Sequence, residues 1–187
     1  MTNDSTIIEN ETVRAILTRH SVRKYTQEPV SGDEILTLME CARFAPSGLN
    51  NQPWRYVLIQ NNETKQKLSK LTHYSEIVKT APLLVAGFLD AAASYNREKD
   101  IAAIGAGFEN ILLAAHSMNL GAVWLGEILK NKDAVAEILS VPKNYELMAV
   151  IAVGHPAEDS IRLSRQNERN DRKSLDDIVF WEKYSEK

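Results

Sequence analysis

The chain has 187 residues and a formal net charge of −3 at neutral pH, with 44% hydrophobic and 25% charged residues. This size and composition are typical of one globular domain with a real core, and they exclude a largely disordered chain. The slight acidic excess argues against nucleic-acid binding, and the single Cys41 excludes an intrachain disulfide or a cysteine zinc site. Without a signal-peptide pattern or an apolar run of membrane-spanning length, we expect a cytoplasmic protein with no membrane partner.

The N-terminal part of the chain predicts two helices and a polar loop. Apolar positions between residues 8 and 17 are spaced for one face of a first helix, which leads into a basic segment at residues 19–25. A second helix should begin at the capping box of Ser31 and Glu34. It should end before the loop at residues 46–54, because proline disfavours helix at the residue before it.

The middle of the chain alternates strands and helices without a regular βαβ order, so we predict the α+β class. The apolar stripe of the longest helix is so wide that this helix should be central. Gly121, just beyond it, suits a left-handed cap. The expected elements are strands at residues 55–59, 82–89, 122–125 and 147–153 and helices at residues 63–71, 99–118 and 133–139.

The last thirty residues, 158–187, are rich in charges of both signs and are expected to form an exposed arm. A short helix on this arm should be capped by Ser174 and needs a surface on which to dock. Its apolar residues are Leu175, Ile178, Val179 and Trp181.

The basic segment brings two guanidinium groups and a hydroxyl close together, at Arg19, Ser21 and Arg23. Such a set can surround a phosphate monoester with charge-assisted hydrogen bonds. An equally weighted interpretation is that the basic residues complement the negative end of the preceding helix.

The loop at residues 46–54 places Ser, Asn, Asn and Gln between two prolines and a tryptophan. Polar side chains on such a rigid frame suit a planar heterocycle with its own donors and acceptors.

Other candidate residues give weaker indications of function. The four histidines lack metal-ligand spacing, Gly105 and Gly107 favour close helix packing over a dinucleotide fingerprint, and Cys41 is interpreted as structural. Because no nucleophile or acid–base pair stands out, the reactivity should come from a cofactor.

Four segments, in order along the chain, resemble the motifs of the nitroreductase family of FMN flavoproteins. Residues 19–25 (Arg-His-Ser-Val-Arg-Lys-Tyr) resemble the opening motif, and residues 46–54 (Pro-Ser-x-x-Asn-x-Gln-Pro-Trp) resemble the second. Residues 114–126 are similar to the third, and residues 141–158 to the closing strand and turn. The resemblance covers about residues 14–184.

The resemblance implies a mixed, largely antiparallel sheet flanked by helices, in an intertwined homodimer with FMN at the subunit interface. Residues 1–187 would form a single FMN-binding domain, in which residues 158–187 are an arm that packs on the partner subunit. The family's mid-chain polar contact to the flavin has no counterpart that can be placed between residues 61 and 79.

The resemblance also implies the roles of the first motif. Arg19 and Ser21 would hold the FMN phosphate with His20 beside them, and Arg23 would lie near flavin N1 and the C2 carbonyl. A fixed positive charge there favours hydride acceptance. No catalytic side chain is implied, because the chemistry takes place at flavin N5.

The other implied contacts come from three further parts of the chain. The second motif would touch the flavin or its ribityl chain, in part from the other subunit, two backbone amides would face N5 and O4, and two late cations would reach the phosphate. These contacts are Pro46, Ser47, Asn50 and Gln52; Leu125 and Gly126; and Arg172 with Lys173.

The activity implied is transfer of a hydride from NADH or NADPH through flavin N5 to nitroaromatic, quinone or similar electron-poor acceptors. Because one flavin face would serve both substrates in turn, the kinetics would be ping-pong. One alternative keeps the scaffold and changes the reaction to reduction of enones or carbonyls, dehalogenation, or cleavage of flavin itself. Another is a flavin-binding or redox-sensing protein without turnover. The sequence fixes neither the physiological acceptor nor the choice of nicotinamide.

Overall fold

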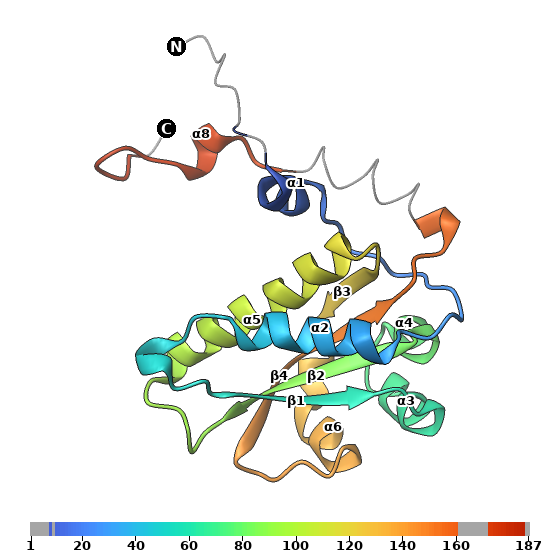
Figure 1. The fold of residues 1–187 in the computed structure, drawn as a ribbon. Helices are drawn as coiled ribbons and strands as arrows, with labels where there is room; N and C mark the ends of the chain where they lie inside the picture. Colours follow the sequence, from blue (N-terminus) through green and yellow to red (C-terminus); the bar gives the residue numbers. More distant parts are fainter. Residues whose placement is uncertain (1–7, 9, 161–171, 186–187) are drawn as a thin grey trace.

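Apolar runs in the sequence form the central strands of a four-stranded sheet. The computed structural model describes residues 8, 10–160 and 172–185 and orders the strands β1-β2-β4-β3 (Figure 1). The central strands are β2 (Leu83–Asp90) and β4 (Tyr145–Gly154), and the edge strands are β1 (Trp54–Ile59) and β3 (Gly121–Leu125). All the ladders between these strands are antiparallel. The predicted α+β class is therefore confirmed.

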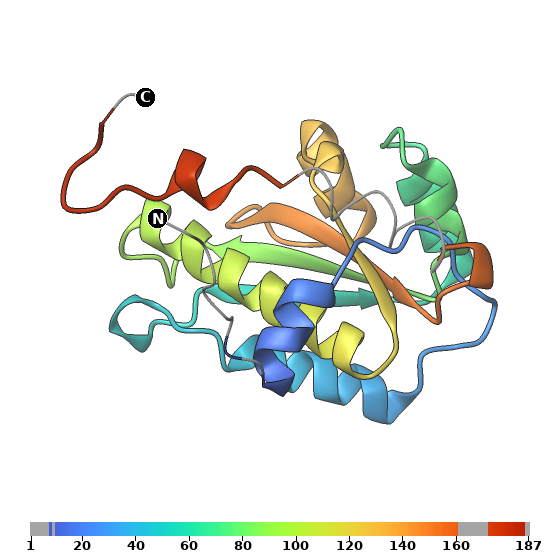
Figure 2. The ribbon, with the colours of Figure 1, turned by 90° about the horizontal axis from the view of Figure 1, so that it is seen from above.

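Helices cover both faces of this sheet, which explains why β2 is buried along its whole length. One face carries α2 (Gly32–Arg43) and the long α5 (Arg97–Ser117), as Figures 1 and 2 show. The shorter helices α3, α4 and α6 pack on the other face. Elsewhere in the described residues the helical elements are α1 (Glu11–Thr18), η1 (Gly48–Asn50), α3 (Asn62–Ser69), α4 (Ser75–Thr80), η2 (Glu127–Asn131), α6 (Lys132–Ile138) and α8 (Leu175–Ile178).

The predicted elements are present with small shifts of their ends, and three short ones were missed. The capping box of α2 is complete, since the Ser31 hydroxyl accepts from the Glu34 amide and the Glu34 carboxylate accepts from the Ser31 amide. The helix α4 and the 3-10 turns η1 and η2 were not predicted. Each is too short to show a helical period, and none has a side-chain cap.

The prediction for Gly121 is wrong. Asn119, with φ 61°, takes the left-handed conformation that ends α5, and Gly121 is the first residue of β3. A Cβ at Gly121 would lie 2.5 Å from Cγ1 of Val22. The glycine is therefore needed for close approach of the chain at Val22, and the left-handed turn is provided by an asparagine, whose short polar side chain tolerates it.

The two ends of the described chain expose apolar side chains. In α1, Ile16 and Leu17 are about half exposed, and in the arm Leu175 and Trp181 are 73% and 87% exposed. Ser174 occupies the N-cap position of α8, as predicted, and its hydroxyl donates to the Asp177 carboxylate. Residues 161–171 of the predicted arm lie outside the described residues. No helix in the described ranges is long and apolar enough to cross a membrane.

Replacement of Gly121 by alanine should destabilise the fold, because the new methyl group would overlap Val22 at the edge of β3. We expect a loss of about 1–3 kcal/mol in the free energy of unfolding, measured by urea denaturation. Gly32→Ala is the matched control, since nothing lies within 4 Å of a Cβ at Gly32. Equal denaturation midpoints for the two variants would contradict this packing role.

Candidate functional site

The predicted phosphate segment, residues 19–25, lies between the edge of β3 and the end of β4. Ser21 forms an isolated parallel bridge with Ala122 of β3. The buried Tyr25 hydroxyl donates to the Ala152 carbonyl of β4 at 3.1 Å, and burial raises the pKa of Tyr25 well above its usual value. The first, third and closing motifs of the resemblance therefore meet at one end of the sheet.

The two guanidinium groups of this segment differ in their surroundings. Arg19 is the C-cap residue of α1, and its side chain is 17% exposed, 3.7 Å from the Glu109 carboxylate. Arg23 is exposed. The prediction that the basic cluster begins at a helix C-terminus is confirmed.

His20 belongs to a small network that joins α1 to the end of α5. Its Nδ1 lies 3.2 Å from the Thr18 carbonyl oxygen, which can only accept, so the network assigns the proton to Nδ1. The Thr18 hydroxyl donates to the Arg14 carbonyl at 2.7 Å and accepts from His116 Nε2 at 2.8 Å. The two imidazole rings meet edge to face, with centroids 6.1 Å apart. His116 is therefore a packed histidine.

The predicted amide pair lies where β3 ends and η2 begins. Leu125 is the last residue of β3, and the exposed Gly126 precedes η2. The first N–H groups of a helical turn have no partner inside the turn. This corner of the backbone can therefore offer donors to an electron-rich group.

Glu127 ties this turn to the segment before α4. Its carboxylate accepts from the Thr72 hydroxyl at 2.6 Å and from the His73 amide at 3.1 Å, and it pairs with Lys130. Hydrogen bonds from Lys130 and Thr72 lower the pKa of Glu127 to about 2. The carboxylate therefore stays ionised near neutral pH and keeps residues 72–73 beside the turn. This is where the interval of residues 61–79, which offered no predicted contact, approaches the site.

The loop at residues 46–53 has an unusual backbone. Leu49, Asn50 and Gln52 have φ angles of 54°, 54° and 47°, a region that non-glycine residues seldom adopt. Inside the loop, the Gln52 amide donates to the Ser47 hydroxyl at 3.1 Å, and Gln52 Nε2 donates to the Asn50 carbonyl at 3.2 Å. Strain of this kind persists where the surrounding structure holds it, and it clusters at functional sites.

The Asp100 carboxylate holds this loop, and the Asp90 carboxylate pairs with Arg55 of β1 just after it. Neither contact was predicted from the sequence. Asn51 Nδ2 donates to Asp100 Oδ1 at 2.9 Å, and Arg55 Nη2 lies 2.7 Å from Asp90 Oδ2. Arg55 also donates to the Trp54 carbonyl at 2.8 Å. No local motif could have found these pairs, because 49 positions separate Asn51 from Asp100 in the sequence.

The sheet keeps this loop far from the phosphate segment. Through β2, Trp54 at the end of the loop lies level with Glu146 of β4, whereas Ala122, which bridges Ser21, pairs with Val153. The seven positions between Glu146 and Val153 correspond to about 24 Å along β4, and three strand spacings add about 14 Å across the sheet. In Figure 1 the loop lies at the left end of the sheet and the segment after α1 descends on the right.

Some buried polar atoms in both motifs have no hydrogen-bond partner in the described part of the chain. They are His20 Nε2 and Asn51 Oδ1, and the Tyr56 hydroxyl is a third such atom. Since buried polar atoms nearly always have a partner, these atoms leave room for a hydrogen bond from a bound molecule. Cations at Arg19 and Arg23, backbone donors near Gly126 and amides on the loop fit the phosphate and the polar ring edges of a flavin mononucleotide.

Arg172 and Lys173, the predicted late phosphate contacts, are exposed residues that precede α8. Neither is buried against residues 19–25, so their role stays a prediction.

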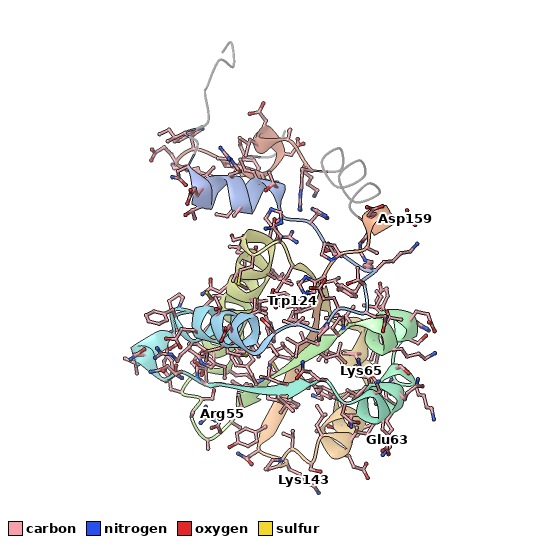
Figure 3. The ribbon with its side chains drawn as sticks, turned by 45° about the vertical axis from the view of Figure 1, so that its right-hand side comes forward. Arg55, Glu63, Lys65, Trp124, Lys143 and Asp159 are labelled. Carbon is pink, nitrogen blue, oxygen red and sulfur yellow. The ribbon has the colours of Figure 1, made fainter. Side chains whose placement is uncertain are left out.

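A cavity of about 550 Å³ lies beside α5 and β3. Its wall includes Trp124, 41% exposed, which packs edge to face on Phe108 at 4.8 Å between ring centroids and lies beside α5 in Figure 3. On its rim, Arg97 and Lys132 both pair with the Glu146 carboxylate, at 3.0 and 2.8 Å. The other lining residues are Ile101, Ile104, Gly105, Leu129, Leu147 and Met148.

The α+β fold and the grouping of the motifs agree with comparison to known proteins. The model of the nitroreductase family matches residues 16–87 and 69–155, and the chain belongs to this family.

Individual relatives agree with this assignment. A protein of Methanothermobacter thermautotrophicus, assigned as an NADH dehydrogenase/NAD(P)H nitroreductase, is 30% identical over 158 residues, which cover 83% of each chain. The FMN reductase [NAD(P)H] of Bacillus subtilis is 29% identical over 178 residues, covering 83% of this chain and 70% of the relative. A crystal structure from Desulfovibrio desulfuricans, of a protein assigned as a nitroreductase in complex with FMN, is 37% identical. It superposes with a TM-score of 0.85 and covers 95% of this chain and all of that one.

Proposed function

We propose that this chain is an FMN-dependent oxidoreductase that works as a homodimer and takes electrons from NADH or NADPH. The names of its relatives and the FMN bound to the Desulfovibrio protein support the cofactor and the reaction class. Nitroaromatics, quinones and similar electron-poor molecules are the proposed acceptors. The cytoplasmic location also stays a prediction.

The main support for a homodimer is the distance between the two polar motifs, residues 19–25 and residues 46–53. One flavin cannot contact both residues 19–25 and residues 46–53 of the same chain if about 24 Å along the sheet and about 14 Å across it lie between them. Each cofactor site would therefore combine the phosphate segment and the Gly126 turn of one copy with the loop of a second. A two-fold dimer would form two such sites.

In this arrangement the side chains and amides of the protein bind and orient the cofactor and place fixed charges beside it. Arg19 and Ser21 hold the phosphate, Arg23 places a positive charge beside the pyrimidine edge of the ring, and the amides at Leu125 and Gly126 face its central edge. When bound, FMN supplies the redox chemistry, by accepting a hydride from the nicotinamide at N5 and passing it to the acceptor. Because donor and acceptor occupy the same space in turn, the mechanism is ping-pong.

The arm at residues 172–185 is proposed to seat in the cavity of the second copy. Its exposed apolar residues, with Trp181 at 87%, match a cavity whose floor is apolar. Charge also matches, since the rim has two cations, Arg97 and Lys132, for one carboxylate, and the first turn of α8 is acidic. Burial of a tryptophan would supply much of the contact area.

The purified protein should bind FMN and be yellow, and NADH or NADPH should bleach it in the absence of oxygen. Arg23→Ala should weaken FMN binding by about ten- to a hundredfold, because a charge-assisted hydrogen bond contributes roughly 1.5–3 kcal/mol. The dissociation constant is measured by flavin fluorescence, with the exposed neighbour variant Lys24→Ala as control.

Several outcomes would contradict this function. Protein that takes up no added FMN would exclude the flavin assignment, and bound flavin that neither nicotinamide reduces would favour a binding or sensing role. Intersecting initial-rate lines, in place of parallel ones, would exclude the ping-pong mechanism. A strong preference for one acceptor outside the nitroaromatics and quinones would favour the alternative reactions.

Trp181→Ala should weaken self-association by roughly a thousandfold, because truncation of a central aromatic anchor typically costs 2 kcal/mol or more and a two-fold dimer loses two such anchors. Sedimentation equilibrium of the wild type and the variant measures the dimer dissociation constant. Tyr74→Ala is the control, since Tyr74 is an exposed aromatic next to α4 that does not line the cavity. Equal dissociation constants for Trp181→Ala and the wild type would exclude the arm as an anchor.

A further inference from the structure

Asp100 is a buried carboxylate that no described cation pairs with. It lies in the first turn of α5, it has no exposed surface, and four donors converge on it. Oδ1 accepts from Asn51 Nδ2 at 2.9 Å, and Oδ2 accepts from the Ser94 hydroxyl at 2.7 Å and from the amides of Tyr95 and Asn96 at 3.1 and 3.3 Å.

This set of donors keeps Asp100 ionised. Burial alone would raise its pKa, but the hydrogen bonds from Ser94, Asn51 and the two backbone amides outweigh burial and lower the pKa. The N-terminal end of α5 also favours a negative charge. A carboxylate held in this way is a fixed acceptor, and its position is set by the helix.

Asn51 transmits that position to the loop. Its Nδ2 donates both to Asp100 and to the Ala93 carbonyl at 3.1 Å, so two acceptors outside the loop orient the amide. On either side of Asn51 in the sequence, Asn50 and Gln52 have left-handed backbones. A left-handed residue is unfavourable unless its neighbours are held, and the Asn51 side chain anchors the loop between these two residues.

We propose that Asp100 is a positioning residue, which acts through Asn51 to hold residues 47–52 in the conformation that contacts the flavin of the second copy. The contact itself rests on the proposed function. The positioning does not, because it concerns bonds within one chain.

The same helix turn also serves the cavity. Arg97 and Ile101, which flank Asp100 in α5, line the proposed seat of the partner's arm. The first turns of α5 therefore fix the spacing between the two surfaces proposed to face the second copy, the loop and the cavity. If a substitution moved Asp100, the loop would shift away from the flavin site. The dimer itself could still form, because the arm and the cavity would be unchanged.

The test begins with Asp100→Asn. An asparagine offers one oxygen where the carboxylate offers two, and its amide group would face either the Asn51 amide or the donors at residues 94–96. We expect faster hydrogen exchange at the amides of Asn50, Asn51 and Gln52 in the protein without flavin, and FMN binding at least tenfold weaker. Asn51→Ala, which leaves Asp100 its three other donors, should change both quantities in the same direction even if Asp100→Asn folds poorly.

Two controls separate positioning from general stability. Leu68→Ala removes a fully buried side chain in α3, far from the loop, and is compared at a temperature where it and Asp100→Asn are equally folded. The double variant Asn51→Asp/Asp100→Asn restores a carboxylate–amide bond with its polarity reversed. It should recover part of the lost FMN affinity and slow the exchange of the loop amides.

The outcomes are distinct. The proposal is overturned if Asp100→Asn exchanges its loop amides no faster than Leu68→Ala, or if the two bind FMN equally well. It is also overturned if the double variant binds as weakly as Asp100→Asn. Wild-type protein that fails to bind FMN would exclude the proposed function, while the exchange measurement would still decide whether Asp100 holds the loop.

Discussion

The register of the antiparallel sheet sets the distance between the two groups of polar residues in this protein. Because Trp54 lies level with Glu146 and Ala122 lies level with Val153, the loop at residues 46–53 and the segment at residues 19–25 leave the sheet at opposite ends. The central strand β2 and most of β4 are buried on both faces, so this separation cannot relax without loss of the core. This constraint is the main support for the proposed homodimer, together with His20 and Asn51 atoms that have no partner among the described residues.

Each polar group is fixed to the sheet by buried atoms, and the means differ at the two ends. At one end Gly121 provides space for Val22, and the Tyr25 hydroxyl bonds to β4, so residues 19–25 lie along the edge of β3. At the other end the Asp100 carboxylate holds a loop with a strained backbone, and Asp90 pairs with Arg55 where the loop enters β1. Rigid supports of this kind suit a protein whose own side chains would bind and orient a cofactor, since binding geometry is then set before the ligand arrives.

Much of the fold could be predicted from the sequence because its signals are local. The capping box at Ser31, the apolar run of β2 and the wide stripe of α5 each depend on residues within one element. The roles that depend on contacts between distant residues could not be predicted. Asn119 and Gly121 both suit a left-handed turn, and only the packing of Val22 decides between them. The Asn51–Asp100 bond likewise has no local pattern. The motif residues could be named from the sequence and the family resemblance. That they lie at opposite ends of the sheet could be seen only from the register of the strands.

The most direct test of the account asks whether one cofactor site uses two chains. Variants with a damaged phosphate segment (Arg19→Ala/Arg23→Ala) and with a damaged loop (Asn50→Ala/Gln52→Ala) are co-expressed with different tags, and the mixed dimer is purified through both tags. Each variant alone should bind no flavin. The mixed dimer should bind about one FMN, because one of its two sites combines the intact segment of one chain with the intact loop of the other. A mixed dimer without flavin would contradict the account, since it would mean that each chain needs both motifs for its own site.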